Sequence, residues 1–160
     1  MSDLPLVSVM IPTYRQVDFL AEAVRSVLAQ SYRRMEVVVA DDDPDSSAAG
    51  ALTPFASDTR FRYLNTDKNR GRVRNYHWLL HDLARGEYAL NLDGDDLFAD
   101  AGYIARAVSV LETEPDVALV FARRLSFSGD PPALSFESNP AVTNLDGTTV
   151  LLIFHKVMDT

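Results

Sequence analysis

The sequence predicts an α/β fold in which a doubly wound, mostly parallel β-sheet carries helices on both faces. Two observations predict this fold. Short apolar runs rich in β-branched residues alternate with segments of helical periodicity over residues 6–122, and this alternation is typical of parallel sheets with helical crossovers. In addition, residues 35–40 form a nearly continuous apolar run, which is expected of a strand that is covered on both faces.

The first half of the chain is expected to supply three strands and two helices. Apolar runs predict strands, in chain order, over residues 6–11, 35–40 and 60–65. The last of these alternates polar and apolar residues, as a shorter edge strand would. Apolar residues recur at helical spacing from Phe19 to Leu28 behind Asp18, which is a favourable N-cap residue. Ser46 and Ser47 are expected to open a short helix that reaches Phe55.

The second half is expected to add two strands and three helices. Strands are predicted over residues 88–92 and 117–122. Helical stripes of apolar residues predict helices over residues 76–83, 100–113 and 150–157. Gly86 is expected to close the first of these helices and Pro115 to stop the second. Residues 126–144 are rich in proline without a clear period, so we expect a long surface excursion there.

Composition limits the classes of protein to which the chain can belong. A net charge of −8 at pH 7 argues against non-specific binding to nucleic acid or an anionic membrane, because both need a basic surface. The apolar runs are strand-length and no signal sequence opens the chain, so we expect a cytoplasmic protein without a membrane segment. There is no cysteine, so any metal must be bound by oxygen or imidazole. His77 and His81 lack a third ligand, and we interpret them as a surface pair.

Carboxylates gather where the predicted strands end. Asp93-Gly94-Asp95-Asp96 follows the fourth strand, and Asp41-Asp42-Asp43 follows the second. Carboxylates this close repel one another unless a cation or hydrogen-bond donors offset the repulsion. Strand alternation places Asp93 and Asp95 on the same side of the chain. A divalent metal is therefore the favoured occupant, and a solvated acidic turn is the alternative.

These strand ends are expected to lie along one edge of the sheet. Parallel doubly wound sheets bind ligands outside the carboxyl ends of their strands, and Pro12-Thr13-Tyr14 follows the first strand there. Residues 68–74 hold four cations, which indicates either a segment that faces phosphate or a solvated helix start. The sequence has neither a dinucleotide fingerprint nor a P-loop. Phosphates would therefore be bound by metal and arginine.

Several motifs in fixed order resemble those of the inverting nucleotide-sugar glycosyltransferases with the GT-A fold, of the glycosyltransferase family 2 type. The motifs are Val-Ser-Val-Met-Ile-Pro-Thr-Tyr at 7–14, Ser-Val-Leu-Ala-Gln-Ser-Tyr at 26–32, Glu-Val-Val-Val-Ala-Asp-Asp at 36–42, Asn69-x-Gly71 with Arg74-Asn75, and residues 86–96 around Asp93-Gly94-Asp95-Asp96. Each motif is weak alone. Their order and spacing carry the resemblance, which covers residues 7–121.

The resemblance implies a role for each of several residues. At the base end of the site, it places Pro12 and Tyr14 beside the nucleotide base and has Asp42 accept a hydrogen bond from that base. A carboxylate that faces a base imide N–H favours a uridine or thymidine donor. Asp93 would lie near the ribose and diphosphate.

At the diphosphate end, the resemblance implies that Asp95 ligates Mn²⁺ or Mg²⁺, with Asp93 as its neighbour in the metal site. Arg72 or Arg74 would contact the diphosphate. The metal and the guanidinium groups would stabilise the negative charge that builds on the departing diphosphate. The implied partner is a nucleoside-diphosphate sugar, and the acceptor stays unknown.

Two departures from the family pattern affect this assignment. Asp43-Pro44-Asp45 stands where the family usually has Gly or Asn followed by Ser, and residues 69–75 are shorter than usual. No family motif supplies a general base for the acceptor hydroxyl, so we expect that residue beyond Thr160. Residues 1–160 would then be one donor-binding domain of a longer enzyme.

Two alternatives stay open. A non-catalytic nucleotide-sugar-binding module would bind UDP with Mn²⁺ without hydrolysing a donor. A phosphoacceptor receiver domain would also place an acidic cluster over Mg²⁺. It would need a lysine after the fifth strand, where this chain has Arg123-Arg124.

Overall fold

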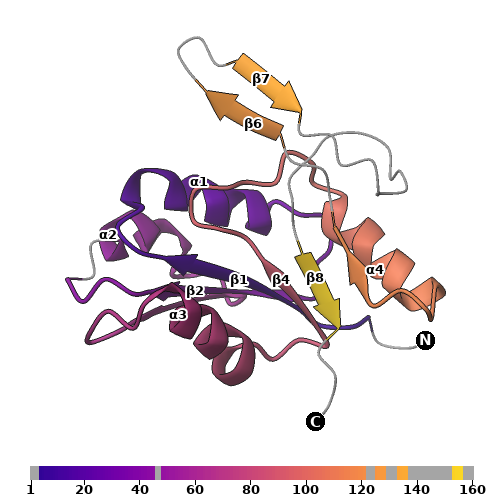
Figure 1. The fold of residues 1–160 in the computed structure, drawn as a ribbon, viewed down its shortest axis with the longest axis horizontal. Helices are drawn as coiled ribbons and strands as arrows, with labels where there is room; N and C mark the ends of the chain where they lie inside the picture. The colour runs from indigo at the N-terminus through magenta and orange to yellow at the C-terminus, as the bar shows by residue number, and fades with distance from the viewer. Residues whose placement is uncertain (1–3, 46–47, 122–124, 129–132, 137–152, 157–160) are drawn as a thin grey trace.

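The computed structural model describes residues 4–45, 48–121, 125–128, 133–136 and 153–156. Within these ranges, a six-stranded sheet has the order β3-β2-β1-β4-β8-β5 (Figure 1). Its strands are β1 (Val7–Thr13), β2 (Met35–Asp41), β3 (Phe61–Asn65), β4 (Tyr88–Asn91), β5 (Leu119–Val120) and β8 (Ile153–Lys156). A separate hairpin consists of β6 (Leu125–Ser128) and β7 (Ala133–Phe136).

The four strands β3, β2, β1 and β4 are parallel to one another. β1 lies at the centre of this group, where Val9 is paired with Val37 of β2 and with Leu90 of β4. β8 is antiparallel to both β4 and β5. The predicted α/β fold with a mostly parallel sheet is confirmed.

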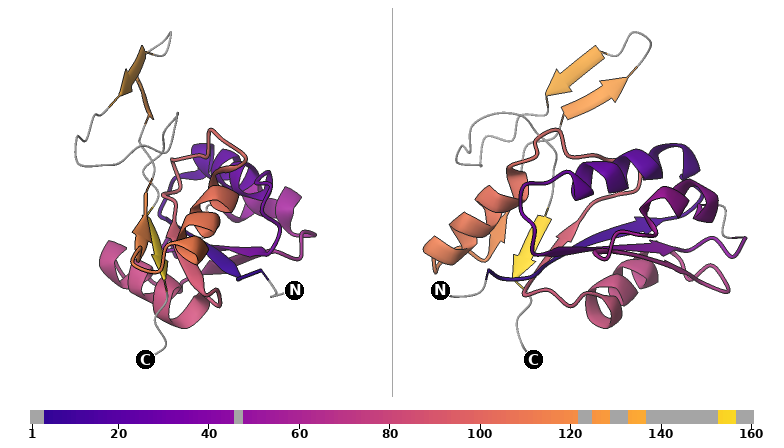
Figure 2. Two further views of the ribbon diagram at one scale, coloured as in Figure 1. Left: turned by 90° about the vertical axis from the view of Figure 1, so that its right-hand side faces the viewer. Right: turned by 180° about the vertical axis from the view of Figure 1, so that it is seen from behind.

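Helices cover both faces of the sheet. They are α1 (Val17–Leu28), α2 (Ala49–Leu52) with the 3₁₀ turn Thr53–Phe55, α3 (Arg72–Trp78) with the π-helical turn Leu79–Leu83, and α4 (Tyr103–Thr113). α1 and α4 lie over one face and α3 lies over the other (Figure 2).

The alternation of side chains along β2 explains the two cores. Val37 and Val39 pack in the larger core with the buried stripes of α1 and α4, whereas Val38 and Ala40 pack in a smaller core with the turn that follows α3. All seven residues of β2 are buried. Both faces of this strand are therefore covered, as its apolar run predicts.

Three details of the predicted helices are wrong. Gln16, and not Asp18, is the N-cap of α1, and Asp18 lies in the first turn, where a negative charge is favourable. α3 begins at Arg72, within the basic segment. The turn after α3 ends at Ala84, which is extended. Gly86 instead lies against strand backbone: an added Cβ would stand 2.6 Å from Ser8 N and 2.7 Å from Leu6 O.

The carboxyl-terminal part differs most from the prediction. The helix expected over residues 150–157 is wrong for Ile153–Lys156, which form β8. The apolar spacing fits a helix, but a short apolar run does not distinguish helix from strand by its period. The edge of β4 accepts these residues as a further strand. The fifth strand has two residues in place of six, and the expected excursion contains the hairpin β6–β7.

No helix within the described ranges has both the length and the hydropathy that crossing a bilayer requires.

Candidate functional site

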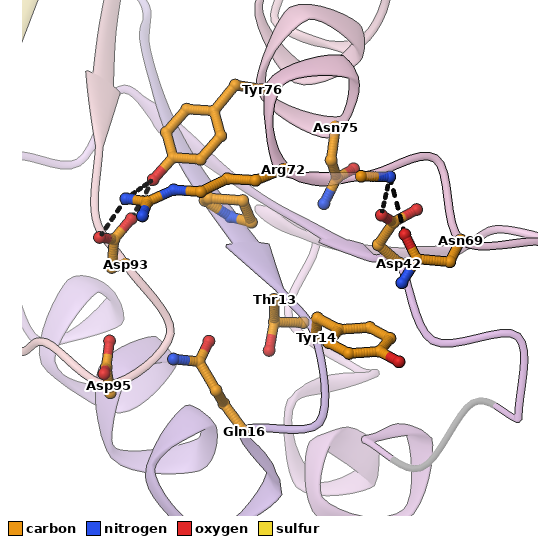
Figure 3. A pocket seen from close by; sticks show the side chains of 12 residues that line it. Thr13, Tyr14, Gln16, Asp42, Asn69, Arg72, Asn75, Tyr76, Asp93 and Asp95 are labelled. Carbon is orange, nitrogen blue, oxygen red and sulfur yellow. Dashed lines mark hydrogen bonds and ion pairs between the residues drawn. The ribbon is translucent and has the colours of Figure 1, made fainter.

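The carboxyl ends of β1, β2 and β4 border a cleft of about 420 Å³ together with the start of α3 (Figure 3). Every site residue predicted from the sequence except Arg74 lines this cleft. These residues are Pro12, Tyr14, Asp42, Arg72, Asp93 and Asp95. Arg74 is exposed on α3 and lies outside the lining.

The Asp42 carboxylate joins the end of β2 to the start of α3. Its Oδ1 accepts hydrogen bonds from Arg70 N at 2.8 Å and Thr66 Oγ1 at 3.2 Å, and its Oδ2 accepts one from Gly71 N at 2.8 Å. Gly71 has a φ of 83°, which glycine adopts without a steric penalty. Asp42 itself is 3% exposed. The loop at the mouth of the cleft is therefore fixed by a buried carboxylate.

Asp93 is held by three neighbours. The Tyr76 hydroxyl and Asn91 Nδ2 both donate to Asp93 Oδ1, the latter at 3.3 Å. Arg72 Nη2 lies 3.5 Å from Asp93 Oδ2 and donates to the Tyr76 hydroxyl at 3.4 Å (Figure 3). Burial and the hydrogen bond to Asp93 raise the pKa of Tyr76. Tyr76 is therefore a neutral donor that orients the carboxylate.

Asp95 differs from Asp93 in its surroundings. The chain turns after Asp93, since Asp96 N donates to Asp93 O at 2.9 Å. Asp95 is exposed at the cleft, and among the described residues nothing forms a hydrogen bond or ion pair with its carboxylate. Both of its oxygens are thus open to a ligand.

Two buried polar atoms of the cleft lack a partner within the described residues. They are Thr13 Oγ1 and Asn75 Oδ1. Asn75 is 2% exposed, and its Nδ2 donates to Ala40 O at 2.9 Å. Buried polar groups are nearly always hydrogen-bonded, so these two atoms are exceptions within the wall of the cleft.

Sequence reasoning missed the roles of Tyr76 and Gln16. Tyr76 was assigned to an apolar helical stripe, and its hydroxyl gives no signal in a periodic pattern. Gln16 lines the cleft beside the Asp93-to-Asp95 turn, and no motif marked it. Asn75 belongs to the Arg74-Asn75 motif, but that motif predicts no function for its side chain.

The side chains of the cleft supply few groups that could ligate a metal. Among the described residues, no group of three or more His, Cys, Asp or Glu side chains is arranged to hold a metal ion. Asp93 and Asp95, which are separated by Gly94, are the two carboxylates after β4 that line the cleft. A metal here would need further oxygen ligands from a bound molecule.

Comparison with known proteins gives a family match. Residues 8–147 match the family model described as glycosyl transferase family 2. The glycosyltransferase GlyG of Streptococcus pneumoniae serotype 4 is 28% identical over 115 residues, which are 71% of this chain and 38% of GlyG.

Solved structures match in fold. The mannosyltransferase PcManGT from Pyrobaculum calidifontis, in complex with GDP-Man and Mn²⁺, has a TM-score of 0.68 at 25% identity, over 77% of this chain and 36% of that one. S. aureus TarS 1–349 in complex with UDP-GlcNAc has a TM-score of 0.57 at 23% identity, over 66% and 31%. These neighbours are GT-A glycosyltransferases, which confirms the predicted fold. The chain spans less than two fifths of GlyG and of both solved proteins.

Proposed function

Since the chain belongs to glycosyl transferase family 2, we propose that it is the donor-binding part of a metal-dependent, inverting glycosyltransferase. The enzyme would transfer a sugar from a nucleoside-diphosphate sugar to an acceptor. One observation carries this proposal: Asp42 and Asp95, which follow different strands, line the same cleft. A nucleoside diphosphate needs both a base site and a diphosphate site within one cavity.

The nucleobase is assigned to the end of the cleft at Pro12, Tyr14 and Asp42. A carboxylate offers about four lone-pair positions, and three of those on Asp42 accept bonds from Thr66, Arg70 and Gly71. One position is left for a donor on the ligand. A single imide N–H, as in uracil or thymine, matches one free acceptor position. PcManGT, at 25% identity, was solved with a guanine nucleotide, so GDP belongs in the test.

The metal is assigned to Asp95, with Asp93 beside it. Mg²⁺ and similar ions are commonly held by one or two carboxylates together with substrate phosphate oxygens, which fits a cleft lined by both Asp93 and Asp95. Asp95 has the open oxygens, whereas Asp93 is held by Tyr76 and Asn91. A bound Mn²⁺ or Mg²⁺ would act as a Lewis acid toward the diphosphate oxygens. Asp93 would also lie near the ribose.

The diphosphate contact is assigned to Arg72 in preference to Arg74. Arg72 lines the cleft and is largely exposed, with 79% of its side-chain surface accessible. Its only ion pair among the described residues is the 3.5 Å contact with Asp93. A guanidinium at this position can bind phosphate oxygens through two parallel hydrogen bonds. It would stabilise the charge on the leaving diphosphate.

Inversion also requires a general base that removes the proton of the acceptor hydroxyl. No described residue is assigned to this role.

Calorimetric titration with UDP, dTDP and GDP tests the proposal. We expect UDP or dTDP to bind in the presence of Mn²⁺ or Mg²⁺ and to lose affinity when EDTA removes the metal. UMP is the matched control, because it retains the base and lacks the second phosphate. The proposal fails if no nucleoside diphosphate binds, or if removal of the metal leaves the affinity unchanged.

A further inference from the structure

Arg15 has a strained backbone and lies in sequence between Tyr14 and Gln16, which both line the cleft. Its φ is 58°, and it is the sole non-glycine residue with positive φ among the described residues. This left-handed conformation is unfavourable for a long side chain and is tolerated by Gly and Asn. Arg15 directly follows Tyr14, which lines the cleft. The strain therefore lies next to the proposed base site.

The Arg15 side chain is held on the loop that follows β2. Its Nε lies 3.6 Å from Asp43 Oδ1, and its Nη2 lies 3.7 Å from Asp45 Oδ2. The guanidinium carbon stands 5.1 Å from the centre of the Tyr14 ring, within the range of a cation–π contact. One charged group thus connects the loop to an aromatic side chain of the cleft.

The stability that these two ion pairs contribute to the fold does not explain why the strained backbone of Arg15 is kept. The Arg15 side chain is 60% exposed and that of Asp45 is 82% exposed, and an exposed ion pair of this kind contributes little to folding. The Asp43 side chain is 2% exposed, but the guanidinium that faces it at 3.6 Å is open to water. Both contacts are also longer than a hydrogen bond. Backbone strain that stability does not repay is a feature of ligand sites.

We propose that Arg15 is a positioning residue for the nucleobase. Asp43 and Asp45 hold its guanidinium against the Tyr14 ring, and this contact fixes the ring in the orientation that borders the base. The inference rests on the proposed function, because it requires a base beside Tyr14. It also gives a purpose to Asp43-Pro44-Asp45, the stretch that departs from the family pattern.

The test is to replace Arg15 in the 160-residue chain and measure stability and binding separately. Arg15→Gly and Arg15→Asn relieve the backbone strain and remove the guanidinium. We expect the midpoint of thermal unfolding without ligand to rise by about 2–4 °C. We also expect the affinity for UDP with Mn²⁺ to fall about two- to fivefold, the size of an exposed cation–π contact.

Two controls separate positioning from general effects. Arg33→Gly removes an exposed arginine without positive φ in the connection between α1 and β2, and it should lower stability slightly and leave UDP affinity unchanged. Arg15→Lys keeps the positive charge and should retain more affinity than Arg15→Gly. In the Arg15→Gly variant, NMR signals of the Tyr14 ring should show increased motion without ligand.

The outcomes distinguish this inference from the proposed function. A rise in stability with a loss of affinity supports the positioning role. Unchanged affinity in a wild-type chain that binds UDP overturns the inference alone, as does a loss of stability in Arg15→Gly, since Arg15 would then be structural. A wild-type chain that binds no nucleoside diphosphate overturns the proposed function and this inference with it.

Discussion

The Asp42 carboxylate accepts the backbone N–H of Gly71 at 2.8 Å and thereby connects the end of β2 to the first turn of α3. These two residues are separated by 29 positions in the sequence. The contact fixes the start of α3, where Arg72 lines the cleft. A residue expected to recognise the base therefore also shapes the wall of the site.

Replacement of Asp42 should affect both stability and binding. In Asp42→Asn, one amide oxygen replaces two carboxylate oxygens, so residue 42 loses its hydrogen bond with either Arg70 N or Gly71 N. We expect the free energy of unfolding to fall by about 1–3 kcal/mol and UDP affinity to weaken, with the metal requirement kept. Denaturant unfolding and calorimetry measure the two effects. Asp67→Asn, an exposed change in the loop between β3 and α3, is the control, and unchanged UDP affinity in Asp42→Asn would remove Asp42 from the base site.

Replacement of Asp95 should affect binding alone. Asp95→Ala removes an exposed carboxylate that forms no hydrogen bond or ion pair with a described residue and relieves its repulsion with Asp93. We expect metal-dependent UDP binding to be lost, while the thermal midpoint without ligand stays equal or rises. Asp116→Ala, an exposed change after α4, is the matched control for loss of surface charge. A large decrease in the stability of the ligand-free protein would contradict the assignment.

Removal of the Tyr76 hydroxyl should loosen the network around Asp93. Tyr76→Phe deletes the donor to Asp93 and the acceptor of Arg72, so we expect weaker binding of UDP with Mn²⁺. We also expect a loss of stability of about 1–2 kcal/mol, as is usual for a hydrogen bond to a charged group. Calorimetry and chemical unfolding measure both quantities.

Tyr63→Phe is the control for this experiment. The Tyr63 hydroxyl donates to Asp41 Oδ2 at 2.7 Å, and neither residue lines the cleft. This variant should lose comparable stability and keep its nucleotide affinity. If the two variants bind UDP equally well, Tyr76 has no part in donor binding.

Gly86 should tolerate no side chain. A Cβ at this position would meet backbone atoms of Ser8, Leu6 and Tyr88 at 2.6–2.7 Å, so β1 and β4 would have to separate. We expect Gly86→Ala to lower the free energy of unfolding by about 1–3 kcal/mol or more. Gly50→Ala is the control, because nothing lies within 4 Å of the added atom in α2 and alanine favours a helix. Equal stability of the two variants in denaturant would refute the close approach.

The predictable part of the site is the part that follows buried strands. Apolar runs that end abruptly in carboxylates determine both the strand and the position of its last residues, so Asp42 and Asp95 could be assigned to one edge from sequence. The start of α3 was harder to predict, because Val73 is the one large apolar residue within 69–74 and gives no apolar period, although α3 begins at Arg72. The hydrogen bond between Tyr76 and Asp93 spans 17 residues, and no local pattern encodes it.

The error at residues 150–157 has a different origin. Apolar residues at Val150, Leu151, Phe154 and Val157 fit a helix as well as a strand. The sheet decides between them, since Phe154 is paired with Leu90 of β4 and with Val120 of β5. That choice depends on the arrangement of distant strands and not on local propensity.

The position of β8 has a consequence for the hydrogen-bonding edge of β4. Because it lies between β4 and β5, it covers backbone N–H and C=O groups of Tyr88–Asn91 that would otherwise face water on that side. An uncovered strand of this kind is a template on which other copies of a chain can assemble into aggregates. β8 thus occupies the edge of β4 on which a strand of another chain could otherwise pair.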